Sequence, residues 1–82
     1  EEFAVILPAS DLEGARLVAE RVRAGMERGL FRETSAATAE VTLSLGVARL
    51  RDDEDAHGLV ARADLALYRA KAAGKNQVEL AD

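Results

Sequence analysis

The sequence predicts a mixed α/β domain in which elements follow the order strand, helix, strand, helix, strand. Three short apolar segments, at residues 3–7, 41–48 and 78–80, have the length and composition of strands. Two longer segments, at about residues 12–29 and 56–73, repeat apolar side chains at helical spacing. Because 82 residues allow one small domain at most, we expect residues 1–82 to form a single unit.

The first predicted strand covers Phe3–Leu7. Its five apolar residues are unbroken and end at Pro8, which favours a central strand that is buried on both faces over a helix.

The first predicted helix begins at a capping box formed by Ser10 and Glu13 and continues to Gly29. Its other face is charged and is most simply solvated. That face carries two pairs of opposite charge at i,i+4 spacing, Arg16 with Glu20 and Arg23 with Glu27.

The second predicted strand, Val41–Ala48, alternates large apolar residues with small ones. One face of this strand is therefore shallow, and another part of the protein should pack closely against it. A helix is the simpler candidate for that partner, and a ligand is the alternative.

An acidic run, Asp52–Asp55, comes directly before the second helix. It could bind a cation, but it lacks the glycine and the distal glutamate of a calcium loop, so helix capping is favoured. The helix should run from Ala56 to Ala73 and stop at Gly74, with a last short strand at Val78 and Leu80. Its predicted buried stripe consists of Leu59, Ala63, Leu67 and Ala70.

The composition excludes several kinds of site. The chain has no cysteine and one histidine, which excludes disulfides, Cys-ligated zinc and a His-rich metal site. A net charge of -4 argues against a general nucleic-acid surface. No apolar run approaches the ~20 residues that a membrane span needs, so we expect no membrane contact by this segment.

Two pairs of charged residues could carry chemistry. Glu1 and Glu2 could hold Mg²⁺ beside a strand end, although adjacent glutamates are also common at solvated termini. Lys71 and Lys75 could bind phosphate, or could simply offset the negative end of the helix dipole. The residues alone favour the simpler interpretation of both pairs. No glycine-rich loop opens a helix, which excludes a P-loop or dinucleotide-binding cradle within these residues.

Three segments together resemble the GGDEF family of diguanylate cyclases. EEFAVILP at residues 1–8 is similar to the end of the GG(D/E)EF signature and the strand after it. VTLSLGV at residues 41–47 and ADLALYRAKAAGKN at residues 63–76 resemble two later motifs, in the same order and spacing. The resemblance spans nearly the whole chain. It implies a partial domain that begins inside the signature and has a palm-like fold related to nucleotide cyclases.

The resemblance also implies roles for individual residues. Glu1 matches the signature residue that binds Mg²⁺ and helps to activate the attacking 3′-hydroxyl, and Glu2 matches its neighbour at the same two-metal site. Lys71 and Lys75 match two basic positions that contact the GTP phosphates, although the family more often has arginine at the second. Arg21 matches a secondary contact to cyclic di-GMP, and a solvated helix charge is as good an explanation. Asp64, Tyr68 and Asn76 are expected to serve in structural hydrogen bonding and packing.

The implied activity is the condensation of two GTP into cyclic di-GMP and pyrophosphate across a homodimer. The alternative is a catalytically silent module that binds GTP or cyclic di-GMP and regulates a neighbour. The family's first strand, the other metal-binding aspartate and the guanine contacts lie outside these residues, so we expect the chain alone to be inactive. An open sheet edge could also allow a strand-swapped assembly. The domain is expected in the cytoplasm, in a parent protein that other domains could anchor to a membrane.

Overall fold

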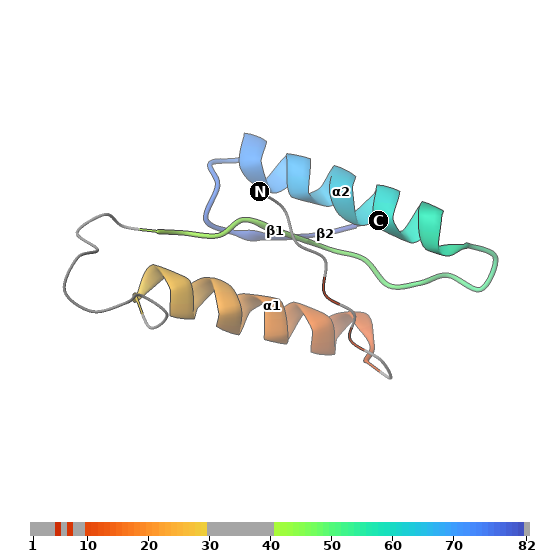
Figure 1. The fold of residues 1–82 in the computed structure, drawn as a ribbon, viewed down its shortest axis with the longest axis horizontal. Coiled ribbons are helices and arrows are strands. Elements are labelled where there is room, and N and C mark those ends of the chain that lie inside the picture. The colour runs from red at the N-terminus through yellow and green to blue at the C-terminus, as the bar shows by residue number, and fades with distance from the viewer. Residues whose placement is uncertain (1–4, 6, 8–9, 30–40, 82) are drawn as a thin grey trace.

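The computed structural model describes residues 5, 7, 10–29 and 41–81. Its elements are helix α1 (Leu12–Glu27), strand β1 (Leu45–Val47), helix α2 (Ala56–Ala72) and strand β2 (Val78–Leu80). The two helices lie on opposite sides of the strands, and each helix contacts both strands (Figure 1). The mixed α/β class is therefore confirmed.

β1 and β2 form a parallel pair. Leu45 lies opposite Val78, and Val47 lies opposite Leu80. The ladder is extended at both ends, because Leu45 N–H donates to the Gln77 carbonyl at 2.9 Å and Ala81 N–H donates to the Val47 carbonyl at 2.7 Å. The predicted last strand is confirmed. The predicted strand over 41–48 is shorter than expected, since only Leu45–Val47 find a partner among the described strands.

The first predicted strand is wrong at the two of its residues that the structure describes. Val5 and Leu7 lie outside any strand, and the Val5 side chain is 79% exposed. An apolar run becomes a strand only where a neighbouring backbone pairs with its amides, and no described strand does so here. Phe3, Ala4 and Ile6 lie outside the described residues.

The cap of α1 is Asp11, one residue later than the predicted Ser10. The Asp11 carboxylate accepts from Gly14 N–H at 2.7 Å, whereas Glu13 binds Arg16 and does not close a capping box. A carboxylate is a stronger match for the positive end of the helix than a hydroxyl, which explains the shift. The helix also ends earlier than predicted, at Glu27.

The charged face of α1 differs from the prediction. Arg16 pairs with Glu13 at 2.6 Å in place of Glu20. Arg23 pairs with Glu27 at 3.2 Å, as predicted, and also with Glu20. The Arg23 side chain is only 16% exposed, so this part of the face is not solvated.

α2 packs directly on the shallow face of β1, as predicted. A Cβ at Gly46 would lie 2.2 Å from the Ala63 carbonyl oxygen and 2.3 Å from Leu67 N, so the helix backbone rests on the glycine. Small residues line this contact, and Ala66 and Ala70 are fully buried. The predicted stripe was correct at Ala70 but missed Ala66, and Leu59, Ala63 and Leu67 are only half-buried. Close approach of helix and strand buries the smallest side chains most completely.

The acidic run before α2 caps the helix, as predicted. Asp55 accepts from Gly58 N–H at 2.9 Å. Glu54 instead forms a two-pronged pair with Arg62, with both N–O distances at 2.7 Å. Arg62 also donates to the Arg49 carbonyl, which fastens α2 to the segment after β1.

We predict that the Glu54–Arg62 pair gives a defined acid dependence of stability. The hydrogen bond from Arg62 lowers the pKa of Glu54 to about 2, from an ordinary value of 4.5. A lowered folded-state pKa means that the stabilisation is complete above pH 4.5 and is lost as the pH falls toward 2.

Urea unfolding at several pH values should show Glu54→Gln less stable than wild type at pH 7 and equally stable near pH 2. In an Arg62→Gln background the same substitution should lose most of this pH dependence. A difference that stays constant from pH 7 to pH 2 would contradict the assignment.

Candidate functional site

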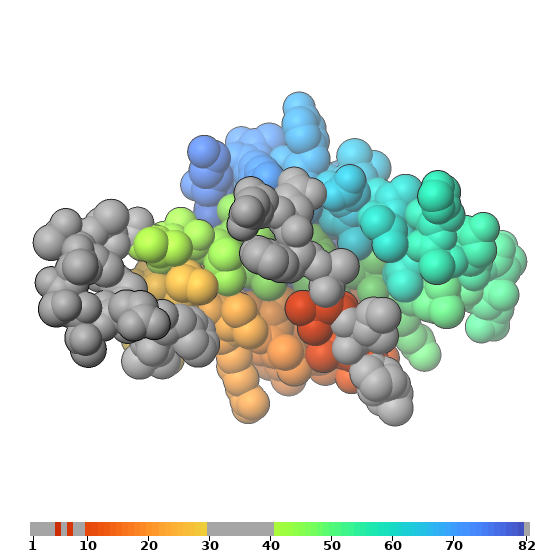
Figure 2. Space-filling view, in the orientation of Figure 1, coloured from red at the N-terminus to blue at the C-terminus, as the bar shows by residue number. Residues whose placement is uncertain are grey.

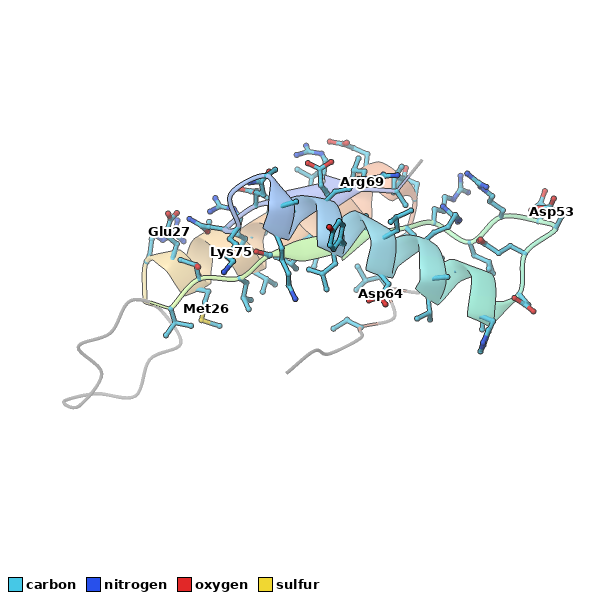
Figure 3. The ribbon with its side chains drawn as sticks, turned by 90° about the horizontal axis from the view of Figure 1, so that it is seen from above. Met26, Glu27, Asp53, Asp64, Arg69 and Lys75 are labelled. Atoms are coloured by element: carbon cyan, nitrogen blue, oxygen red, sulfur yellow. The ribbon has the colours of Figure 1, made fainter. Side chains whose placement is uncertain are left out.

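The candidate phosphate-binding residues Lys71 and Lys75 lie together at the C-terminal end of α2. Lys71 is in the last turn, Lys75 follows the helix, and both side chains are exposed. Figure 3 shows Lys75 at the same end of the molecule as Glu27 and far from Asp53. The structure thus brings both predicted lysines to one end of one helix.

The backbone that carries Lys75 has an unusual conformation. Gly74, Lys75 and Asn76 all have positive φ, at 126°, 65° and 50°. Glycine adopts such angles freely and asparagine tolerates them, but lysine rarely does. The Lys75 N–H donates to the Ala70 carbonyl at 2.9 Å, which closes the end of the helix and fixes where the lysine leaves it.

Asn76 holds this turn against the rest of the fold through three hydrogen bonds. Its N–H donates to Ser44 Oγ at 3.1 Å, and its Nδ2 donates to Glu27 Oε2 at 2.7 Å. Its Oδ1 accepts from Arg23 Nη1 at 2.9 Å. The predicted structural role of Asn76 is confirmed, and it joins the turn to both α1 and the segment that leads into β1.

Arg23 is the centre of this polar cluster. It donates to Glu20, Glu27 and Asn76. The hydrogen bond to Glu20, followed by that to Glu27, raises the pKa of Arg23. Asn76 first, and then Arg23, lower the pKa of Glu27. Sequence reasoning predicted the pair with Glu27 but missed the bond to Asn76, because nothing in the sequence links residues 53 positions apart.

Two other residues of the same motif do not behave as expected. The Tyr68 side chain is 69% exposed and Asp64 is also exposed. Neither side chain makes a hydrogen bond to another described residue. The prediction that they serve in packing and hydrogen bonding is therefore wrong within the described part of the chain.

The metal-binding prediction falls on residues whose surroundings are not described. Glu1 and Glu2 lie outside the described residues. Among residues 10–29 and 41–81, no three acidic, histidine or cysteine side chains gather closely enough to hold a metal ion. The magnesium assignment therefore rests on the chemistry of Glu1 and Glu2. Arg21, the candidate for a cyclic di-GMP contact, is exposed on α1.

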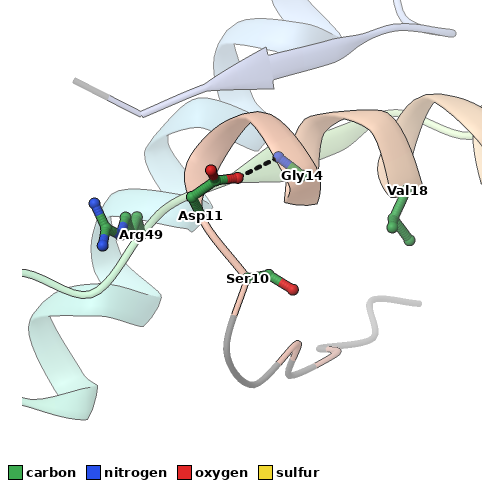
Figure 4. A pocket seen from close by; sticks show the side chains of 5 residues that line it. All are labelled: Ser10, Asp11, Gly14, Val18 and Arg49. Atoms are coloured by element: carbon green, nitrogen blue, oxygen red, sulfur yellow. Dashed lines mark hydrogen bonds between the residues drawn. The ribbon is translucent and has the colours of Figure 1, made fainter.

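One hollow in the described surface is separate from the lysines. It has a volume of about 670 Å³, lies at the start of α1, and is lined by Ser10, Asp11, Gly14, Val18 and Arg49 (Figure 4). The Asp11 carboxylate is already bonded to Gly14 N–H, and the Arg49 guanidinium points away from Val18. The polar groups that line this hollow do not converge on a common point, so they are not arranged to bind one ligand.

Comparison with known proteins identifies the kind of domain. Residues 1–77 match the family described as "Diguanylate cyclase, GGDEF domain". The chain is 40% identical over 81 residues to diguanylate cyclase DgcP of Pseudomonas aeruginosa, covering 99% of this chain and 12% of that protein. It is 38% identical over 80 residues to diguanylate cyclase VdcA of Vibrio cholerae, covering 95% of this chain and 24% of that protein. It is 40% identical over 81 residues to diguanylate cyclase A of Treponema denticola, covering 98% of this chain and 22% of that protein.

These alignments cover nearly all of this chain and less than a quarter of each relative. In the part of the chain that the structure describes, neither helix is long and apolar enough to cross a bilayer.

Proposed function

The chain belongs to the GGDEF family, and from this premise we propose that residues 1–82 supply part of the GTP site of a diguanylate cyclase. The observation that carries the proposal is the pair of exposed lysines at one end of α2. A helix C-terminus repels anions, so a phosphate there must be held by long cationic side chains. Lys71 and Lys75 meet that requirement, and both have the charge and reach for a triphosphate.

Magnesium would be held by Glu1 and Glu2, together with an aspartate from the rest of the domain. Carboxylate oxygens are hard ligands that suit Mg²⁺. Bound Mg²⁺ would neutralise charge on the triphosphate and favour ionisation of the attacking 3′-hydroxyl. In this arrangement Glu1 lies at the reacting centre, while Lys71 and Lys75 orient the phosphates and stabilise the departing pyrophosphate.

The proposed reaction joins two GTP molecules into cyclic di-GMP across a homodimer of the full domain. Arg21 is proposed as a secondary contact to the product. Residues 1–82 would act as one part of this domain, on the cytoplasmic side of the cell, and would be inactive alone.

One edge of β1 has no partner among the described strands, so a strand-swapped assembly of the isolated chain is also proposed. In Figure 2 the yellow-green segment that leads into β1 is visible between the two helices.

A catalytically silent module that binds GTP or cyclic di-GMP is the second candidate. In the GGDEF family the position of Glu1 is occupied by an acid that binds the metal, and this chain has a carboxylate at that position. That residue favours the active cyclase. The two candidates separate on product formation, because both bind nucleotide and only one makes cyclic di-GMP.

We predict that Lys71→Ala weakens GTP binding in the full-length protein without destabilising the fold. A charge-assisted phosphate contact contributes ~1.5 to 3 kcal/mol, which corresponds to a loss of roughly 10- to 150-fold in affinity. Binding should be measured by calorimetry with 3′-deoxy-GTP, which lacks the attacking hydroxyl and cannot react.

The matched control is Arg49→Ala, which removes an exposed cation beside the start of α1, at the end of that helix away from Glu27. The control should keep its affinity within about 2-fold, because screening limits the effect of a distant surface charge. Equal affinity of wild type and Lys71→Ala would remove Lys71 from the site.

A further inference from the structure

The turn that presents Lys75 has an uncommon backbone conformation that its surroundings must support. Lys75 and Asn76 are non-glycine residues at φ of 65° and 50°, in the left-handed region that a lysine rarely adopts. The Lys75 side chain is exposed, so packing around it supplies little support. Two local bonds support the turn, from the Lys75 N–H to the Ala70 carbonyl and from Gln77 Nε2 to the Lys75 carbonyl. The support from distant parts of the chain comes through Asn76, whose side chain and N–H make three hydrogen bonds to them.

Two of those three bonds lead to α1. Glu27 accepts from Asn76 Nδ2, and Arg23 donates to Asn76 Oδ1. The two together also decide which way the amide faces, because one needs its nitrogen and the other its oxygen.

Arg23 is itself held in place by contacts other than the one to Asn76. Its Nε and Nη2 bind the Glu20 carboxylate, and its Nη1 is shared between Glu27 and Asn76. All three guanidinium nitrogens donate hydrogen bonds, and a lysine, with its single ammonium group, could not make the same set of contacts. The Arg23 side chain is 16% exposed, whereas its partners Glu20 and Glu27 are 42% and 49% exposed, so the arginine is the buried member of the cluster.

We propose that Arg23 is a positioning residue for the substrate triphosphate: through Asn76 it fixes the left-handed turn that aims Lys75 at the phosphates. This inference rests on the proposed function, since it gives Lys75 a phosphate to bind. Arg23 itself does not contact the substrate. Arg23 changes the affinity for GTP only by positioning Lys75. Its contribution to the stability of the fold is separate.

The test is a double-mutant cycle between Arg23 and Lys75 in the full-length protein, with binding of 3′-deoxy-GTP and thermal unfolding as the two measurements. Lys75→Ala should weaken binding roughly 10-fold or more, as expected for a lost charge-assisted contact. Arg23→Ala should weaken it by roughly 3- to 10-fold at a temperature where the variant is fully folded. In the Lys75→Ala background, Arg23→Ala should have almost no further effect on binding, although its effect on unfolding persists.

Two further variants separate positioning from general stability. Arg16→Ala removes an arginine of the same helix that pairs with Glu13, one turn away from the start of the cluster, and it should leave binding unchanged. Asn76→Gly keeps the positive φ accessible but removes both side-chain bonds, and it should weaken binding as Arg23→Ala does.

The outcomes distinguish the inference from the function on which it rests. If Lys75→Ala leaves binding unchanged, the proposed phosphate contact and this inference both fail. If Lys75→Ala weakens binding but Arg23→Ala does not, only the positioning role is wrong. The positioning role is also overturned if Arg23→Ala weakens binding equally with and without Lys75, because a purely structural residue would behave in that way.

Discussion

Gly46→Ala is expected to destabilise the fold strongly. The added Cβ would lie 2.2 Å from the Ala63 carbonyl oxygen and 2.3 Å from Leu67 N. Both atoms belong to the backbone of α2, so no rotamer change can relieve the clash. The helix would have to move away from β1, which would open the contact around the fully buried Ala66 and Ala70.

Overpacking of this kind costs ~1 to 3 kcal/mol where side chains can adjust, and more where backbone must move. We therefore expect the unfolding midpoint to fall by more than ~10 °C, since 1 kcal/mol shifts it by roughly 4 to 8 °C in a domain of this size. The measurement is thermal unfolding followed by circular dichroism.

Gly14→Ala is the matched control for this prediction. A Cβ at Gly14 would meet only the Asp11 carboxylate, at 3.1 Å, and Gly14 lies inside a helix, where alanine is the better residue. Its midpoint should stay close to that of wild type. A Gly46→Ala midpoint within about 2 °C of wild type would show that α2 does not rest on β1 as described.

The sequence predicted the elements that depend on local pattern. Both helices, the closing strand and the cap at Asp55 follow from apolar spacing and from acidic residues before a helix, and the structure confirms them. The small residue at position 46 correctly indicated that a helix packs against the strand. These features need only information from neighbouring residues.

The errors arise where a second part of the chain decides the outcome. The apolar run that includes Val5 has strand composition, but a strand also needs a paired backbone. The charged face of α1 was expected in solvent because its own helix satisfies the charges. Arg23 is instead partly buried and donates a hydrogen bond to Asn76, which is far away in the sequence. No local pattern predicts that contact.

Only the local features of the candidate site could be predicted from the sequence. The position of Lys71 and Lys75 at a helix end follows from the length of α2 and the glycine after it. The positive φ values at Lys75 and Asn76 do not follow, because Asn76 is held by hydrogen bonds to Ser44, Glu27 and Arg23, which are distant in the sequence. Glu1 and Glu2 remain predictions.

Glu1→Gln in the full-length protein is expected to have the largest effect on activity. Glutamine keeps the shape and the hydrogen-bonding capacity of glutamate but removes a negative charge, so it tests metal binding with little effect on packing. Even groups that only orient a metal ligand typically contribute 10- to 100-fold. Loss of the ligand itself should therefore lower the turnover number by on the order of 100-fold or more.

The formation of cyclic di-GMP from GTP at saturating Mg²⁺ tests the placement of the catalytic site. Three proteins should be assayed side by side: the full-length protein, its Glu1→Gln variant, and residues 1–82 alone. We predict turnover by the full-length protein and none by the isolated residues, because two-metal chemistry needs carboxylates on both sides of the ions. We also predict a turnover number lowered by on the order of 100-fold or more in Glu1→Gln. Turnover by residues 1–82 alone, or full activity of Glu1→Gln, would contradict the placement of the catalytic site.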